Sequence, residues 1–167
     1  NGKYLEELEP VQPFIKYKTT EHGVSYGNGE AGYDIRIDQT VTFNSCLFGL
    51  IRWTTVVNKH GIKSHHLGHF VLASTKELFV MPSFCVGVVH DKSTWARRGL
   101  SVFNTVIENG WQGFLTLELV YHGRKNLTIK RGSGIAQVIF HKTSQEANYK
   151  GKYSNQPARP VPAINSV

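Results

Sequence analysis

A single glutamate stands inside an apolar run that has the alternation of a β-strand. In Phe-Leu-Thr-Leu-Glu-Leu-Val at 114–120, the three leucines fall on one strand face and Glu118 falls on the other, together with Thr116. Such a carboxylate is either exposed, with a basic partner on a neighbouring strand, or held inside the protein. The pattern alone favours exposure. If the side chain is buried, desolvation raises its pKa and suits it to act as a general base.

Hydroxyls and cations are concentrated in the segment Asp-Lys-Ser-Thr-Trp-Ala-Arg-Arg-Gly-Leu at 91–100. Ser93 or Thr94 is placed to cap a short helix over 94–100. Lys92 and Arg97 flank the same helix start, where free N–H groups and positive side chains can bind an anion. The sequence leaves capping and anion binding equally open.

Four histidines lie within ten residues, but their spacing matches no standard set of metal ligands, and a solvated loop is the better prediction for them: His60, His65, His66 and His69. Zinc-dependent nucleobase deaminases need His-x-Glu followed by Pro-Cys-x-x-Cys. Here the only proline near a cysteine is Pro82, and no second cysteine follows Cys85. A deamination catalysed by this chain would therefore proceed without zinc.

A basic, aromatic and amide-rich run, Tyr-Lys-Gly-Lys-Tyr-Ser-Asn-Gln, occupies 149–156 near the end of the chain. Its composition favours simple disorder. The alternative is a segment that folds over a phosphate ligand, with Lys152 and Gln156 as donors.

The elements that must position these residues are short strands separated by glycine-rich turns. Alternating segments are found at 33–37, 41–43, 70–73, 86–89, 114–121, 127–129 and 135–140. They predict an all-β sandwich or barrel with one or two short helices, at 94–100 and 4–8. The sequence turns polar from residue 144, so we expect one β domain over 1–146 and a flexible tail over 147–167.

The composition is that of a globular protein with an anionic partner. The 167 residues are 40% hydrophobic and 19% charged, with a formal net charge of +7. The cations are scattered in small groups, which suits a phosphorylated small molecule at least as well as a duplex, and we expect neither nucleic acid nor a membrane as partner. No export signal is visible, and Cys46 and Cys85 are expected to be buried thiols, so a cytoplasmic location is expected.

Read together, the segments over 31–156 resemble the dCTP deaminase/dUTPase superfamily. AGYDIR at 31–36 resembles the dUTPase AGYDL and the deaminase SYDLR, and FVLASTKE at 70–77, followed by Met81-Pro82, resembles the deaminase FVLASTLE…LP. KSTWARRGL at 92–100 resembles the deaminase (R/K)SSLAR.GL, while IENGWQG and LTLEL at 107–119 are similar to IDPGWSG and ITLEL. GIAQVIF at 134–140 resembles (R/K)IAQLIF, and GKYSNQ at 151–156 resembles the deaminase ending KYxNQ.

The resemblance implies a distorted jelly-roll, or β-clip, dUTPase-like barrel with its core at 31–141. It also implies a homotrimer, or a dimer of such trimers, with active sites at the subunit interfaces. The deaminase branch fits better, because deaminases carry a glutamate where Glu118 stands and end in KYxNQ, whereas dUTPases close a glycine-rich motif over the phosphates. The expected reaction is hydrolytic deamination of a deoxycytidine nucleotide, most simply dCTP to dUTP and ammonia.

By the same resemblance, the catalytic residues are Glu118 as general base, Ser93, which orients the water, and Arg97, which positions Glu118. The residues that bind substrate would be Lys92, Thr94, Thr105, Val106, Glu108, Trp111, Gln137, Tyr149, Lys152 and Gln156. Mg²⁺ is expected to arrive with the nucleotide phosphates and to have no protein ligand set. The tail would then close over the nucleotide.

Two departures from the family pattern affect specificity. Glu108 stands where the family has an aspartate, and the loop between Leu100 and Ile107 is about two residues shorter than in typical deaminases. A monophosphate or a 5-substituted deoxycytidine nucleotide therefore remains an open alternative. Two other activities also stay open: a dUTPase, alone or in a bifunctional enzyme with Glu108 activating water, and a non-catalytic nucleotide-binding regulator.

Overall fold

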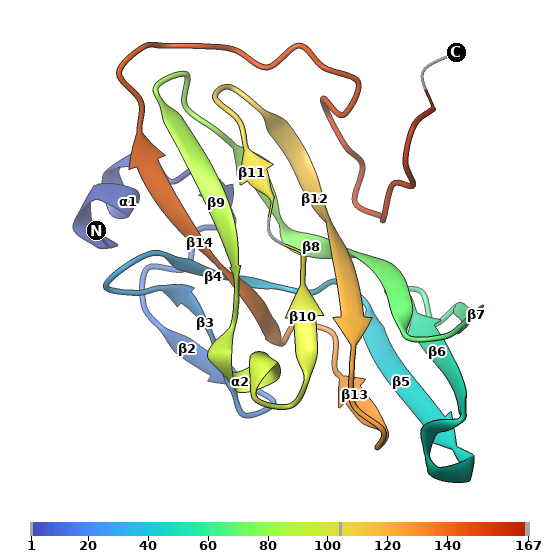
Figure 1. Cartoon of the computed structure of the whole chain (residues 1–167). Helices are drawn as coiled ribbons and strands as arrows, with labels where there is room; N and C mark the ends of the chain where they lie inside the picture. Colours follow the sequence, from blue (N-terminus) through green and yellow to red (C-terminus); the bar gives the residue numbers. More distant parts are fainter. Residues whose placement is uncertain (1, 104, 166–167) are drawn as a thin grey trace.

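The computed structural model describes residues 2–103 and 105–165, and nearly half of them lie in antiparallel strands (Figure 1). In chain order the elements are α1 (Gly2–Leu8), β1 (Val11–Gln12), β2 (Thr19–Glu21), β3 (Val24–Asn28), β4 (Tyr33–Arg36), β5 (Thr40–Cys46), the 3-10 turn η1 (Leu47–Gly49), β6 (Ile51–Val57), β7 (Lys63–Leu67), β8 (Phe70–Val80), β9 (Cys85–Asp91), α2 (Ser93–Ala96), β10 (Leu100–Val102), β11 (Val106–Ile107), β12 (Gln112–Tyr121), β13 (Leu127–Ile129) and β14 (Gly134–Lys142).

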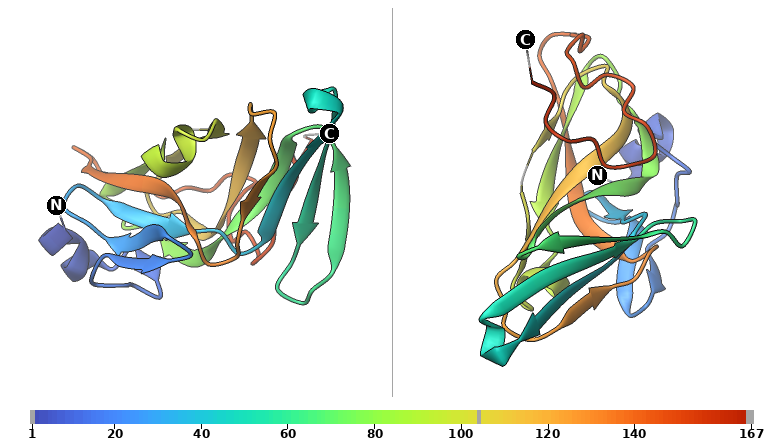
Figure 2. Two further views of the ribbon diagram at one scale, coloured as in Figure 1. Left: turned by 90° about the horizontal axis from the view of Figure 1, so that it is seen from below. Right: turned by 90° about the vertical axis from the view of Figure 1, so that its right-hand side faces the viewer.

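The strands form three sheets, so the all-β prediction is confirmed. One four-stranded sheet has the order β1-β8-β12-β10, a six-stranded sheet has the order β11-β9-β14-β4-β3-β2, and a second four-stranded sheet has the order β13-β5-β6-β7. The longest pairing joins β8 and β12, which places Glu118 opposite Leu72. Figure 2 shows the sheet of β5, β6 and β7 extending to one side of the molecule.

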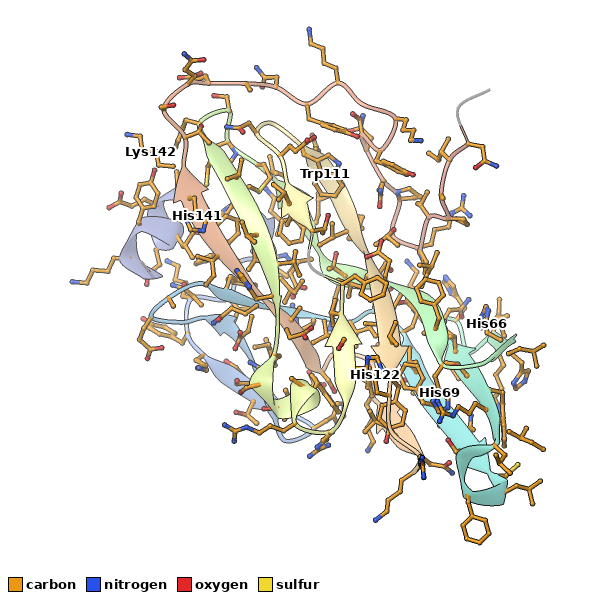
Figure 3. The ribbon with its side chains drawn as sticks, in the orientation of Figure 1. His66, His69, Trp111, His122, His141 and Lys142 are labelled. Carbon is orange, nitrogen blue, oxygen red and sulfur yellow. The ribbon has the colours of Figure 1, made fainter. Side chains whose placement is uncertain are left out.

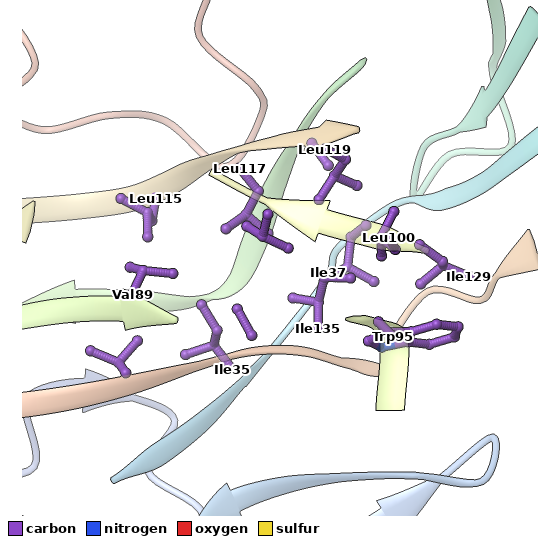
Figure 4. Close-up of a cluster of buried hydrophobic side chains, with 14 of the residues drawn as sticks. Ile35, Ile37, Val89, Trp95, Leu100, Leu115, Leu117, Leu119, Ile129 and Ile135 are labelled. Carbon is purple, nitrogen blue, oxygen red and sulfur yellow. The ribbon is translucent and has the colours of Figure 1, made fainter. Parts of the chain in front are cut away.

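The core lies between the β8-β12-β10 sheet and the sheet of β9, β14 and β4 (Figure 4). Leu115, Leu117 and Leu119 point inward from β12, as their alternation predicts, and each is buried. They meet side chains such as Ile35 and Ile135 from the facing sheet, and burial of each such side chain contributes roughly 1.5–3 kcal/mol. The opposite face of β12 is therefore free to carry polar residues.

A buried ion pair ties β4 to β8. The backbone N–H of Arg36 donates to Glu77 Oε2 at 2.9 Å, and its Nε donates to Oε1 at 2.6 Å. The Arg36 guanidinium carbon also lies 4.6 Å from the centre of the Tyr26 ring. Glu77 is fully buried, so these contacts replace the hydration that its carboxylate loses.

The helix predicted at 94–100 is shorter than expected. α2 covers only Ser93–Ala96, the turn after it ends at Gly99, and β10 begins at Leu100. The predicted cap is wrong, because Lys92 occupies the N-cap position and no side chain bonds to the first helical amides. The cap lies one residue before the hydroxyls, and a helix boundary read from a sequence is uncertain by one or two residues.

The histidines do not form one solvated loop, which corrects that prediction. His65 and His66 lie exposed on the edge strand β7, and His60 is in the turn before it. His69 is buried, with Nε2 2.9 Å from the Asn44 carbonyl and Nδ1 3.2 Å from the Tyr121 carbonyl (Figure 3). These partners are distant in the sequence, so local spacing could not reveal them.

The cysteines also differ from each other. Cys85 is buried at the start of β9, as predicted, but Cys46 is exposed at the end of β5. The apolar neighbours of Cys46 do not cover it, since Leu47 and Phe48 are themselves exposed at the turn into β6. Among the described residues, no helix is long and apolar enough to cross a membrane.

Candidate active site

A cavity of about 440 Å³ opens on the face of β12 that carries Glu118. Its walls come from β8, β12, the segment 105–108 and the chain after residue 148. Seven of the residues predicted from the sequence line it together: Thr105, Val106, Glu108, Trp111, Glu118, Tyr149 and Gln156. Segments as far apart in the sequence as Phe70 and Ala163 thus converge on one concave site, as binding sites for small molecules require.

Glu118 is half-buried in this cavity and has no cationic partner. Within 2–103 and 105–165, no lysine, arginine or histidine lies at ion-pair distance from its carboxylate. Burial raises the pKa of Glu118 above the usual glutamate range, and a backbone hydrogen bond opposes the rise. The sequence pattern favoured an exposed carboxylate with a basic partner, and that prediction is wrong. A carboxylate with a raised pKa beside a ligand cavity is suited to accept and return a proton.

Thr116, two residues before Glu118 on the same strand face, anchors the tail. Its hydroxyl donates to Gln156 Oε1 at 2.9 Å and accepts from the Val161 N–H at 3.0 Å. The backbone of Gln156 also bridges to Gly113, and its carbonyl accepts from the Phe114 N–H at 3.0 Å. Gln156 therefore fastens the tail to the start of β12 in addition to lining the cavity.

Trp111 fixes the same part of the tail through a hydrogen bond. This buried residue, labelled in Figure 3, donates its indole N–H to the Tyr153 carbonyl at 2.9 Å. The turn before it is tight: Gly110 has a φ of +68°, and a Cβ there would meet the Asn148 side chain at 2.5 Å. Only glycine fits this approach, which lets the Tyr149 N–H donate to the Asn109 carbonyl at 2.8 Å.

The other predicted site residues lie elsewhere in the chain and do not line this cavity: Lys92, Ser93, Thr94, Arg97, Gln137 and Lys152. In Figure 1, α2 lies toward the end of β12 opposite to the tail. Ser93 and Arg97 are exposed there, whereas the Lys92 ammonium makes an ion pair with Asp34 in a nearly buried position. Gln137 is directly across from Asp34 in the β4–β14 pairing. The structure therefore contains two separate groups of predicted residues.

Lys152 stands apart from both groups. Its ammonium donates to the Ile164 carbonyl at 2.5 Å and lies 5.3 Å from the centre of the Tyr153 ring. In this position it joins two stretches of the tail to each other and has no contact with the cavity.

Some residues of the cavity were not singled out from the sequence. Thr116 could have been, because it shares a strand face with Glu118. Phe70, Leu72, Val161 and Ala163 offered no such signal, since nothing local shows that their segments meet. Across the described part of the chain, no group of three or more His, Cys, Asp or Glu side chains is placed to hold a metal ion.

The three sheets are arranged in a dUTPase-like β fold. The chain is similar in structure to a dUTPase from phage phi11 of S. aureus, with a TM-score of 0.53 and 14% identity over 85% of this chain and 95% of that one. It is also similar to the EIAV dUTPase, with a TM-score of 0.50 and 17% identity over 74% and 84% of the two chains. At these identities the likeness establishes the fold alone.

The sequence comparisons establish the family. The dCTP deaminase-like family model matches residues 53–143. A dCTP deaminase of Nitrosomonas europaea is 34% identical over 96% of this chain and 90% of its own length, and one of Ehrlichia canis is 32% identical over 93% and 90%. The chain belongs to the dCTP deaminase-like family.

Proposed function

We propose that the protein hydrolyses the exocyclic amine of a deoxycytidine nucleotide, most simply converting dCTP to dUTP and ammonia. The observation that carries this proposal is the position of Glu118, a carboxylate with a raised pKa and no cation at ion-pair distance among the described residues, in the cavity of a dCTP deaminase-like chain. Curated relatives with this family assignment are named dCTP deaminase. We further propose that the enzyme works in the cytoplasm.

In the proposed mechanism, water adds to C4 of the cytosine ring while Glu118 takes its proton. Glu118 then passes this proton to the ring nitrogen, which leaves a hydroxyl and the amine on C4. It next takes the proton of that hydroxyl and gives it to the amine, so that the C4 carbonyl forms, the C–N bond breaks and ammonia leaves. A positioned general base typically contributes about 10² to 10⁴-fold to such a step. Ser93 would orient the water and stabilise the developing negative charge, and Arg97 would hold Glu118 in place.

This mechanism requires more than one subunit, because Ser93 and Arg97 do not line the cavity of their own chain. We propose that a homotrimer, or a dimer of such trimers, brings α2 of one subunit to the Glu118 cavity of another. Both side chains are exposed and available for such a contact. Cyclic assembly would make every site equivalent.

The remaining predicted residues would divide the nucleotide between them. Thr105, Val106, Glu108 and Trp111 would contact the base and the deoxyribose. The phosphates would meet Lys92 and, from the tail, Lys152 and Gln156. Thr94, Gln137 and Tyr149 would make further contacts with the substrate. Lys92 must leave Asp34, and Lys152 must leave Ile164, to make these contacts. Mg²⁺ would be held by the substrate phosphates, which suits a chain whose described residues offer no ligand cluster.

Incubation of the purified protein with dCTP and Mg²⁺ tests the proposal. Ammonia and dUTP in equal amounts are expected. Pyrophosphate with a monophosphate would identify the alternative pyrophosphatase activity, and a nucleotide that binds but stays unchanged would identify a regulator. Parallel incubations with dCMP and with 5-methyl-dCTP measure whether Glu108 and the short 101–106 loop have altered the preferred substrate.

A further inference from the structure

The turn between β5 and β6, residues 47–51, exposes four large apolar side chains and is called the apolar finger below. Phe48 is 95% exposed, Leu50 84%, Leu47 62% and Ile51 51%. The finger lies at the end of the sheet that extends to one side in Figure 2, and toward the opposite end of the molecule from the tail in Figure 1. Single exposed apolar residues are ordinary, but a cluster of them marks a binding surface.

The backbone of the finger has a conformation that its side chains disfavour. Leu47 has a φ of +48° and Phe48 a φ of +57°, in the left-handed region that residues with a Cβ rarely adopt. Gly49 follows with a φ of +88°, and the Leu50 N–H donates to the Leu47 carbonyl at 3.2 Å. Glycine at the first two positions would relieve this strain, so the leucine and the phenylalanine serve something other than the stability of the turn.

Three cations stand at the base of the finger without a counter-ion. Arg52 Nε donates to the Gly49 carbonyl at 2.9 Å. The side chain of Arg124 lies against Gly49, where an added Cβ would meet Arg124 Cγ at 3.1 Å, and Lys125 follows it in the chain. None of these three cations forms an ion pair with a residue of 2–103 or 105–165. Their charges are therefore available to an anionic partner.

The sheet that carries the finger has no acidic residue. The sequence contains no aspartate or glutamate between Asp38 and Glu77, a stretch that includes β5, β6 and β7, and none between Glu118 and Glu146, a stretch that includes β13. Helix α1, with two glutamates, lies on the opposite side of the molecule in Figure 1. The finger is thus an apolar tip set in positive charge, and an anionic surface would attract this end of the molecule first.

From this combination we propose that the apolar finger docks the protein on an anionic lipid surface. The four apolar side chains enter the boundary between headgroups and acyl chains, while Arg52, Arg124 and Lys125 stay among the anionic headgroups. Lipid surrounds a turn on all sides, whereas a step between stacked bases accepts an apolar wedge only from one groove. The tail lies toward the other end of the molecule, so docking leaves the cavity of Glu118 uncovered.

This proposal revises the expectation that the protein has no membrane partner. That expectation rested on cations scattered in small groups along the sequence. The fold brings cations from β6 and from the turn before β13 to the base of one apolar turn, which their spacing in the sequence does not reveal.

Sedimentation with vesicles tests the proposal without any nucleotide. The wild-type protein should pellet with vesicles of phosphatidylcholine and phosphatidylglycerol in equal amounts, and far less with phosphatidylcholine alone. Leu47→Gly/Phe48→Gly should lower the partition coefficient at least about ten-fold, because two side chains lose their apolar environment. Its melting temperature should be little changed, since glycine favours the left-handed backbone. Arg124→Gln/Lys125→Gln should lower the partition coefficient about 30-fold.

The matched control is Leu67→Ser, which removes a leucine of β7 that is 94% exposed but lies outside the finger. It should bind mixed vesicles as the wild type does. Cys46 supplies a second readout, because it is exposed directly before the finger while Cys85 is buried. A polarity-sensitive fluorophore attached to Cys46 of the folded protein should shift its emission to the blue on mixed vesicles and not on phosphatidylcholine alone.

Several results overturn the proposal. Protein that stays in the supernatant with mixed vesicles does so, and so does equal binding by the double glycine variant or equal binding to both kinds of vesicle. A smaller assembly of the double glycine variant in sedimentation velocity, without vesicle binding by the wild type, identifies a contact between copies of the chain instead. Finger-dependent binding of a single-stranded oligonucleotide, again without vesicle binding, identifies nucleic acid. None of these readouts involves deamination, so the proposed function is tested separately.

Discussion

Two glutamates on paired strands have opposite environments. Glu77, on β8, is fully buried and accepts two hydrogen bonds from Arg36. Glu118, on β12, is half-buried and has no cation at ion-pair distance among the described residues. Burial raises the pKa of both, but for Glu77 the contacts with Arg36 oppose that rise.

The two environments give the same type of side chain a structural role in one place and a chemical role in the other. The carboxylate of Glu77 has its hydrogen-bonding capacity engaged, and its loss would leave a buried guanidinium unpaired. Glu118 keeps its carboxylate oxygens available to a ligand and tolerates either protonation state. A buried acid that is fully paired holds the fold together, whereas one that is left unpaired beside a cavity can exchange protons.

The largest expected effect is on activity, at Glu118. Glu118→Gln keeps the shape of the side chain but removes the base, so the deamination rate should fall by at least about 100-fold. Nucleotide affinity, measured by calorimetry, should change little. Retention of more than about a tenth of the wild-type rate contradicts the assigned role.

The second effect is on stability, at Glu77. Glu77→Gln leaves the Arg36 charge buried without its counter-ion, at a cost of about 3–5 kcal/mol in the free energy of unfolding. For a chain of this size the melting temperature should drop by roughly 10 °C or more. Below that temperature the folded fraction should still deaminate. A variant as stable as the wild type would show that the pair does not hold the sheets together.

The pH dependence of activity and of stability should reflect the raised pKa of Glu118. Because Glu118 must be ionised to act as a base, activity should fall as pH drops through its raised pKa, with a midpoint above the usual glutamate value of about 4.3. The folded state holds this proton more tightly than the unfolded state, so ionisation weakens the fold as pH rises through the same pKa. Glu118→Gln should therefore be at least as stable as the wild type at neutral pH, as chemical denaturation can measure.

The smallest expected effect concerns the tail, whose mobility without ligand remains a prediction. Thr116→Val removes the hydroxyl that binds Gln156 and Val161. The free energy that holds the tail on β12 should fall by about 1 kcal/mol. Trypsin cleavage at Lys150 and Lys152 should become a few-fold faster than in the wild type, and nucleotide should slow it in both. Thr128→Val, which removes an exposed hydroxyl on β13, is the matched control. Equal cleavage with and without nucleotide would disprove closure of the tail.

The strands could be predicted where one face is apolar. The alternation around Glu118 located β12 and its inward leucines, because a strand between a core and a cavity must alternate. The β6–β7 hairpin was not predicted, since every residue of β7 is exposed and leaves no apolar period. The burial of His69 depends on carbonyls from β5 and β12, which only the folded chain brings together.

The site could be predicted only in part, because only the folded chain brings its segments together. Motifs located Glu118, Trp111 and Gln156, which the structure brings to one cavity. They could not reveal that the 92–97 segment lies outside that cavity, because a motif carries no information on how far apart its segments lie in the folded chain. They also gave Lys92 a phosphate role, while its ion pair with Asp34 depends on β14, which pairs with both β4 and β9 and so brings the end of β9 near Asp34.

We propose that Glu118 of one subunit and Ser93 of another form a single active site. Mixing two inactive variants, Glu118→Gln and Ser93→Ala, after denaturation and joint refolding tests it most directly. In a cyclic trimer assembled at random, about a quarter of the sites combine an intact Glu118 with an intact Ser93, so about a quarter of the wild-type deamination rate should return. If mixed trimers form but the mixture stays as inactive as either variant alone, Glu118 and Ser93 of different subunits do not share an active site.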